Sequence, residues 1–115
     1  MAVQKTPAQK TERRSRSRIA ARVPVTIRSQ EDNVKTGGYT RDLATSGVFF
    51  YTDSQIHEGS ELEIVLMLPP ELTEGEKRWV CCQAAVVRVE NALGKSGFGV
   101  AASIRHMQIL PEILP

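Results

Sequence analysis

The segment Glu61-Leu62-Glu63-Ile64-Val65-Leu66-Met67-Leu68 decides the fold class of this chain. Its three leucines and one isoleucine occupy every second position, and Glu61 and Glu63 fall in the opposite phase. Because successive side chains of a β-strand point to opposite faces, this alternation predicts a strand that is buried on one face. Pro69-Pro70 ends the strand, since proline lacks the N–H that a strand interior needs.

Similar patterns occur on both sides of this segment. We predict further strands over residues 23–28, 34–42, 47–52, 78–90 and 97–104. Turn residues separate them, and no stretch of ten residues has the apolar periodicity of a long helix. Residues 105–110, which Pro111 follows, have room for one or two helical turns. Several short strands linked by turns predict an all-β fold, a small antiparallel barrel or sandwich.

Length and composition exclude several classes of protein. The chain has 115 residues, of which 41% are hydrophobic and 24% charged, as expected of one globular domain. The longest apolar run, residues 64–68, is too short to cross a bilayer, and no apolar leader follows the N-terminus. Cys81 and Cys82 are adjacent, so they cannot link distant parts of the chain. We therefore expect a cytoplasmic domain with reduced thiols and no membrane span.

Positive charge is concentrated near the N-terminus. Residues 1–22 contain seven of the fifteen lysines and arginines and one of the thirteen acidic residues, so this segment carries +6 while the whole chain carries +2. Residues 1–17 have almost no large apolar side chain and are predicted to form a flexible basic arm. Residues 18–106 form the predicted barrel domain and residues 107–115 a tail. A basic arm indicates an anionic partner (nucleic acid, anionic lipid or a phosphate ligand) unless it only aids solubility.

The sequence contains no motif for catalysis. His57 and His106 lack the spacing of metal ligands, and the chain has no nucleophile elbow, phosphate-binding loop or zinc pattern. Cys81 and Cys82 lie in one predicted strand and point to opposite faces, where one of them fills the core. We therefore expect no catalytic residue, no metal site and no cofactor.

Two segments carry residue types that suit a guanine nucleotide. Arg18 and Arg22 stand four residues apart where the arm meets the barrel, and guanidinium groups can bind phosphate oxygens or the O6/N7 edge of guanine. Asp42 precedes a turn, and its carboxylate can accept the N–H groups of the guanine N1/N2 edge. Gly47 would permit a positive φ or a close approach by a ligand. Each segment alone is also typical of a basic tail or an Asx turn.

Taken together, these residues resemble a known family. Their order is Arg18-x-x-x-Arg22, Val23-Pro24-Val25, Asp42-x-Ala44-x-x-Gly47 and Gly97-Phe98-Gly99-Val100-Ala101. This order is similar to that of PilZ domains, the bacterial receptor module for cyclic di-GMP, whose pattern is RxxxR with [D/N]xSxxG. The resemblance covers about residues 13–106. Arg14-x-x-x-Arg18 gives a second register, but the Val23-Pro24 that directly follows Arg22 favours the first.

The resemblance implies a six-stranded antiparallel β-barrel with at most a short C-terminal helix. It implies that Arg18 and Arg22 hold phosphates and guanines, that Asp42 recognises a guanine edge, and that Gly47 shapes the binding turn. The implied mechanism is not catalytic. The arm is loose in the free protein and closes over cyclic di-GMP, which changes contact with a downstream protein that the sequence does not identify.

One position departs from the family pattern. Ala44 replaces the motif serine, and the lost hydrogen bond costs about 0.5–1.5 kcal/mol, or up to about tenfold in affinity. Thr45 and Ser46 carry hydroxyl groups nearby, at a different offset. Some family members act as protein adaptors without binding nucleotide, which is the alternative function here. A small barrel that binds RNA or single-stranded DNA is a third hypothesis, and the aromatic content of 5% disfavours it.

Overall fold

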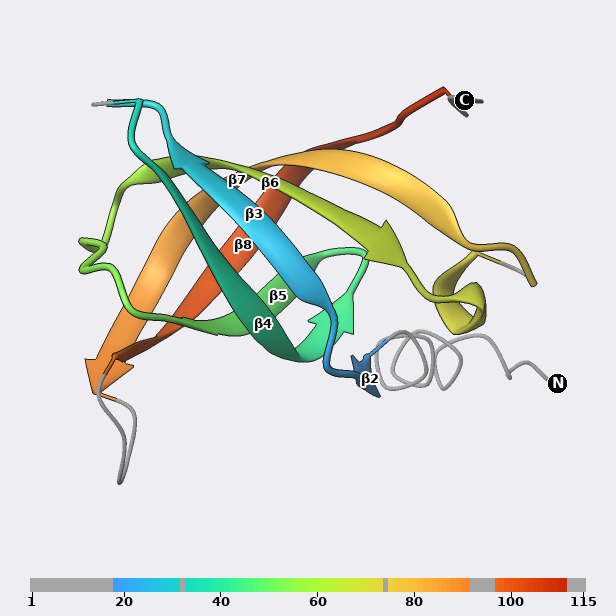
Figure 1. Cartoon of the computed structure of the whole chain (residues 1–115), viewed down its shortest axis with the longest axis horizontal. Coiled ribbons are helices and arrows are strands. Elements are labelled where there is room, and N and C mark those ends of the chain that lie inside the picture. The colour runs from blue at the N-terminus through green and yellow to red at the C-terminus, as the bar shows by residue number, and fades with distance from the viewer. Residues whose placement is uncertain (1–17, 32, 74, 92–96, 112–115) are drawn as a thin grey trace, which may run out of the picture.

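The computed structural model describes residues 18–31, 33–73, 75–91 and 97–111. They form an all-β barrel of six antiparallel strands (Figure 1), as the sequence predicts. The strands are β3 (Pro24–Ser29), β4 (Lys35–Ala44), β5 (Gly47–Thr52), β6 (Glu61–Leu68), β7 (Arg78–Asn91) and β8 (Phe98–Ile109). Their order is β4-β3-β6-β7-β8-β5, and pairing of β4 with β5 closes the ring. A two-residue strand, β2 (Ile19–Ala20), pairs with the end of β4, and a 3-10 turn, η1 (Pro70–Leu72), follows β6.

Alternation along the strands produces the core. In β6 every second side chain is buried, and both glutamates lie on the other face. The other strands contribute in the same way, so the interior is filled by large apolar side chains, among them Ile27, Leu43, Phe50, Leu62, Ile64, Leu66, Val80 and Val100. A barrel of this size is packed solid by its own side chains. A ligand must therefore bind on the outer surface.

The strand pairings of the described residues contain three register shifts, one of them between Gln83 and Ala84 in the pairing of β7 with β8. The other two change which face an outward-pointing charged side chain occupies. The register of β4 with β5 shifts between Thr40 and Asp42, and the register of β7 with β8 shifts between Val86 and Arg88. A bulge adds one residue to one strand and so exchanges the faces of the residues beyond it. Thr40 and Val86 are buried, whereas Asp42 and Arg88 lie on the outer face.

Thr40 fastens the segment that leads into the barrel. Its backbone N–H donates to the carbonyl oxygen of Val23 at 2.9 Å, and its hydroxyl accepts the N–H of Val23 at 2.9 Å and donates to the carbonyl of Ala21. Pairing of β2 with the end of β4 adds to these bonds. Residues 19–23 are therefore held along β4.

The C-terminal part differs from the expectation. Residues 105–109 continue β8 as a strand, so the one or two helical turns for which this segment had room do not form. The strand runs past residue 104, where the sequence placed its end. Residues 80–83 of β7 supply the pairing partners. This long-range pairing outweighs a weak local helix preference. The predicted arm, residues 1–17, lies outside the described residues. Within the described ranges, no helix is long and apolar enough to cross a membrane.

The two adjacent glycines of β4 differ in how closely the neighbouring strand approaches. A Cβ atom on Gly38 would collide with the Tyr51 carbonyl oxygen, whereas the nearest atom to a Cβ on Gly37 would be 3.7 Å away. We expect Gly38→Ala to lower the free energy of unfolding by about 1–3 kcal/mol because the backbone must shift. Gly37→Ala should change it by less than about 0.5 kcal/mol. Urea denaturation measures both, and equal losses would contradict the packing described here.

Candidate functional site

The candidate site lies on the outer face of four neighbouring strands, β4, β5, β8 and β7. Paired residues form a row across them, in the order Asp42, Phe49, Ala101 and Arg88. Residues opposite each other on paired strands point to the same side of the sheet. The next outward row consists of small residues, Ala44, Gly47, Ser103 and Ala85. A carboxylate and a guanidinium group thus stand at the two ends of a low surface.

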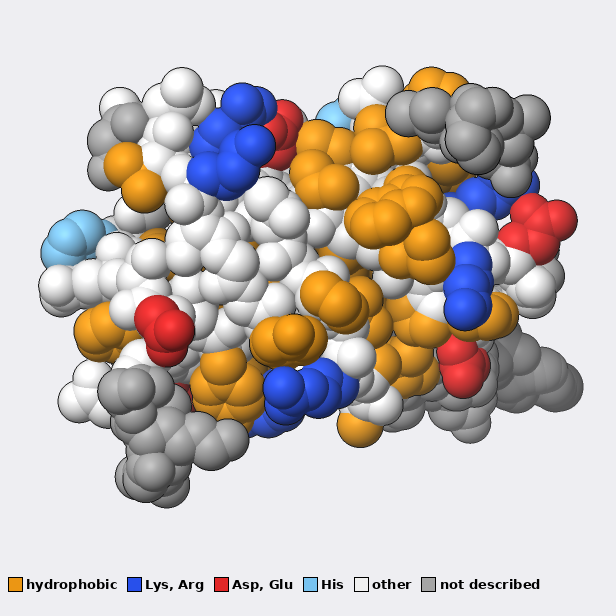
Figure 2. Space-filling model, in the orientation of Figure 1, with side chains coloured by type: hydrophobic (Ala, Val, Ile, Leu, Met, Phe, Trp, Pro, Cys, Tyr) orange, Lys and Arg blue, Asp and Glu red, His pale blue; other side chains and the backbone are white. Residues whose placement is uncertain are grey.

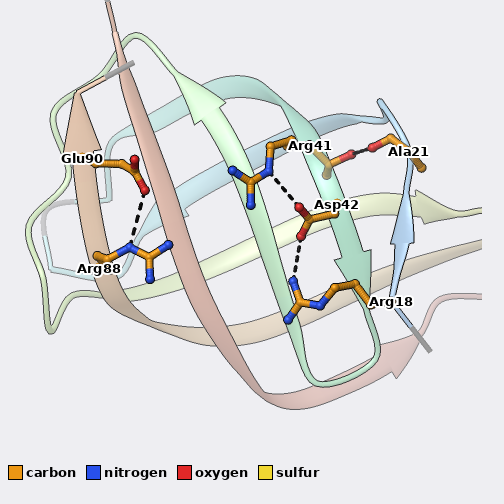
Figure 3. A network of polar contacts seen from close by, with 7 residues as sticks. Arg18, Ala21, Arg41, Asp42, Arg88 and Glu90 are labelled. Carbon is orange, nitrogen blue, oxygen red and sulfur yellow. Dashed lines mark hydrogen bonds and ion pairs between the residues drawn. The ribbon is translucent and has the colours of Figure 1, made fainter. Parts of the chain in front are cut away.

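Asp42 is held between two arginines (Figure 3). Arg18 Nη1 donates to Asp42 Oδ1 and Arg41 Nε donates to Asp42 Oδ2, both at 2.8 Å. The Asp42 side chain is 15% exposed, against 60% for Arg18 and 50% for Arg41. The carboxylate therefore lies beneath the cations that cover it. The hydrogen bond to Asp42 raises the pKa of Arg41 above its usual value, so Arg41 stays charged at all physiological pH values.

Arg41 also covers an aromatic ring. Its guanidinium carbon lies 3.9 Å from the ring centroid of Phe49, and Phe49 meets Tyr51 edge to face with their centroids 5.4 Å apart. Phe49 is only 4% exposed although it lies outside the barrel core. Its ring fits closely against Gly99, where a Cβ atom would lie 2.7 Å from it. The ring and Asp42 together fix the Arg41 side chain, since a surface cation–π contact adds about 0.5–1 kcal/mol.

Three arginines surround a hollow of about 390 Å³, which we call the arginine groove. Arg18, Arg41 and Arg88 line it. The other lining residues are mostly small, with one aromatic ring and two valines, of which Val87 is exposed: Ser46, Gly47, Val48, Phe49, Val87, Ala101, Ala102 and Ser103. Asp42 adjoins the groove through its bonds to Arg18 and Arg41. The structure thus brings together three of the four principal site residues predicted from the sequence, Arg18, Asp42 and Gly47.

The fourth predicted residue, Arg22, lies in an adjoining hollow of about 690 Å³ that shares no lining residue with the arginine groove. Its guanidinium carbon is 4.3 Å from the ring centroid of Tyr39, which is paired with Tyr51. Tyr39 and Tyr51 are 45% and 39% exposed. Aromatic surface is therefore available beside the arginines, which the low aromatic content did not predict.

Gly47 does not have the positive φ that the sequence allowed for it. A Cβ atom here would lie 3.3 Å from the carbonyl oxygen of Ala102. The absence of a side chain therefore lets β8 approach β5 closely. Gly47 also lines the arginine groove, where it keeps the floor low.

The secondary members of the predicted site lie in different environments. Ala44 is buried and shares the face of Asp42, because one core residue, Leu43, separates them in the strand. Ser46 is exposed at the tip of the turn between β4 and β5 and lines the arginine groove. Its hydroxyl group and that of Ser103 lie at the groove, whereas Ala44 has none. Arg14 lies outside the described residues.

The described residues contain no activated cysteine and no metal-binding cluster. Burial raises the pKa of Cys82 to about 12. Burial and a hydrogen bond to Glu63 raise the pKa of Cys81. Both side chains are thus held as thiols near neutral pH, whereas a reactive cysteine needs a lowered pKa. Across the described ranges, no three His, Cys, Asp or Glu side chains come together as metal ligands would.

Comparison with known proteins identifies the family. The PilZ domain model matches residues 12–110. The chain belongs to the PilZ domain family. PilZ domains are in general receptor or adaptor modules and not enzymes. No curated protein matches this chain.

Two solved structures are similar to this PilZ domain. The Bacillus subtilis inhibitor of motility (MotI/DgrA) has a TM-score of 0.65 and 18% sequence identity, over 80% of this chain and 42% of that one. The PilZ domain of CeSA from a cellulose-synthesizing bacterium has a TM-score of 0.48 and 21% identity, over 75% of this chain and 78% of that one. The chain therefore spans less than half of the length of MotI/DgrA, and this likeness shows a shared fold.

Sequence analysis missed several residues of this face, namely Arg41, Arg88, Tyr39 and Tyr51. Arg41 adjoins the motif aspartate, but only the bulge in β4 lets both side chains reach the outer face. Arg88 reaches the groove through the pairing of β7 with β8. The only sequence signal for Arg88 was a charged residue inside the valine-rich segment 78–90. This signal does not reveal which strand pairs with that segment.

Asp42 accepts hydrogen bonds from two cations while largely shielded from water. We expect Asp42→Ala to lower the free energy of unfolding by about 1 kcal/mol at low salt. Glu76→Ala is the matched control, because its ion pair with Arg78 is exposed on both sides and should contribute less than about 0.5 kcal/mol. Urea denaturation at low and high salt measures both, and salt should shrink the difference. Equal decreases in the free energy of unfolding for the two variants would show that the burial of Asp42 does not strengthen its ion pairs.

Proposed function

We propose that this PilZ domain is a bacterial cytoplasmic receptor for cyclic di-GMP that signals without catalysis. One observation carries the proposal: the Asp42 carboxylate adjoins a groove lined by three guanidinium groups over a low floor. The N1/N2 edge of guanine donates hydrogen bonds to a carboxylate, its O6/N7 edge accepts them from arginine, and phosphates bind arginine in a bidentate way. The groove therefore offers a partner for each polar part of a guanine nucleotide.

The contacts of Asp42 provide the switch. In the free protein this carboxylate accepts hydrogen bonds from Arg18 and Arg41. A guanine edge that binds Asp42 replaces these bonds, and the two guanidinium groups turn to the ligand. Arg18 directly precedes β2, so its movement brings the N-terminal arm, residues 1–17, over the nucleotide.

Arg22 reaches the ligand from the adjoining hollow. In the free protein it stacks on Tyr39, and such a contact at an exposed site contributes about 0.5–1 kcal/mol. A charge-assisted hydrogen bond to a phosphate contributes about 1.5–3 kcal/mol. The phosphate therefore outcompetes the ring, and Arg22 joins the ligand when the arm closes.

Titration calorimetry with cyclic di-GMP tests these roles. We expect Arg18→Ala and Arg22→Ala each to weaken binding by about 10- to 100-fold, because each loses charge-assisted hydrogen bonds. Arg78→Ala removes the same charge at the far end of β7 and serves as the control, with a change of less than about threefold. Ala44→Ser should strengthen binding by up to about tenfold, because it restores the motif hydroxyl.

The outcomes separate the receptor from the alternatives. Unchanged affinity in both Arg18→Ala and Arg22→Ala would reject the assigned roles. Absence of both a heat signal and a thermal shift at high nucleotide concentration would reject the receptor, because a ligand that binds the folded state must stabilise it. Displacement of cyclic di-GMP by single-stranded DNA, with strong salt dependence, would favour the nucleic-acid hypothesis.

A protein adaptor that binds no nucleotide is the second candidate, and an exposed apolar surface favours it. Hydrophobic side chains gather over one half of the face in Figure 2. Trp79 is 51% exposed on β7, paired with Met67 of β6 and bonded through its carbonyl to the N–H of Leu110. Large exposed apolar side chains are typical of protein contacts. Loss of protein capture in Trp79→Ala, without nucleotide, would support this role.

A further inference from the structure

The far wall of the arginine groove is Arg88, a residue outside both motif segments. Arg88 stands in one row with Asp42, and only Phe49 and Ala101 lie between them. Four neighbouring strands span three inter-strand spacings, so the two Cα atoms are about 14 Å apart. Phe49 lies beneath Arg41, and Ala101 carries only a methyl group. Arg41 thus covers the part of the row next to Asp42, and the hollow continues over Ala101 to Arg88.

The two bulges aim these residues at the same face. The bulge in β4 precedes Asp42 and the bulge in β7 precedes Arg88, so the two bulges flank the row that contains both residues. The adjacent row, Thr40, Phe50, Val100 and Val89, faces inward. Without the bulges, the alternation would direct Asp42 and Arg88 into the core. Bulges commonly re-aim a side chain at a binding site.

Arg88 is weakly held in the free protein. Its Nε lies 3.4 Å from Glu90 Oε2, and both side chains are more than half exposed. Figure 3 shows this pair on the neighbouring part of the sheet that carries Asp42 and its two arginines. An exposed pair of this kind contributes little and exchanges readily for a better partner. Arg88 is thus a cation that an anionic ligand in the groove can recruit.

We infer that Arg88 binds the phosphate of the nucleotide half that lies away from Asp42, and that Glu90 competes with the ligand for it. The inference rests on the proposed function and adds a residue to the same site. The Asp42 end of the groove holds one guanine and its phosphate, and the ligand is a cyclic dinucleotide with two of each. The second phosphate lies across the floor, on the side of Arg88. Glu90 holds Arg88 in place until that phosphate arrives.

Calorimetry with cyclic di-GMP on two matched pairs of variants tests this inference. We expect Arg88→Ala to weaken binding about 10- to 100-fold. Glu90→Gln should strengthen it about two- to fivefold, because it removes the competitor. Arg78, the first residue of β7, forms an exposed pair with Glu76 just before the strand. Arg78→Ala and Glu76→Gln therefore reproduce the charge changes, and they should change the affinity by less than about threefold and twofold, respectively. The double variant Arg88→Ala/Glu90→Gln should bind like Arg88→Ala, because Glu90 acts through Arg88.

Each result has a distinct meaning. If wild type binds and Arg88→Ala matches Arg78→Ala, the role of Arg88 is wrong and the receptor function stands. If Glu90→Gln strengthens binding equally with and without Arg88, Glu90 acts only through net charge. Glu90 then does not compete with the phosphate for Arg88. If wild type does not bind, the receptor function and this inference fall together. Arg88 is exposed, so loss of folding is not expected, and circular dichroism of each variant confirms this.

Discussion

The extra residue in β4 is the constraint on which the candidate site depends. Because Arg41 is inserted between Thr40 and Asp42, Thr40 points into the barrel and Asp42 points out. The Thr40 hydroxyl then ties residues 21–23 to the barrel wall, and Asp42 binds the side chain that precedes them. The same residues in a regular strand without the bulge would present the opposite face from Asp42 onward, so Asp42 would enter the core and Leu43 would leave it.

An acid adjoins the groove that we propose for a negatively charged ligand, and electrostatics explains why. Arg18 and Arg41 both bond to one carboxylate, so they would repel each other if no anion lay between them. Asp42 supplies that anion in the free protein. The carboxylate is the more shielded partner, so it is also the group whose desolvation must be offset by hydrogen bonds. A guanine edge can satisfy it in the same way. In the proposed receptor, the acid therefore serves both charge balance and recognition of the base.

The sequence predicted those features that depend on local patterns. The alternation in 61–68 and the glycine and proline positions located six strands. Arg18, Asp42 and Gly47, which the sequence predicted as parts of one site, lie together at the arginine groove. Features that depend on register were not predictable, because a bulge is a property of two strands and not of one. Arg41 and Arg88 belong to this class. Residues 105–109 illustrate the same limit: their conformation is decided by β7, which lies far away in the chain.

The closed ring of strands has a consequence for how a signal can leave this protein. Every barrel strand is hydrogen-bonded on both sides along much of its length, so no strand can slide or hinge without breaking two sets of bonds. The barrel is in that sense a rigid support for the groove. In the proposed receptor, a bound nucleotide therefore changes the arginine side chains at the barrel surface and not the order of the strands, so a partner that senses it must contact that surface directly.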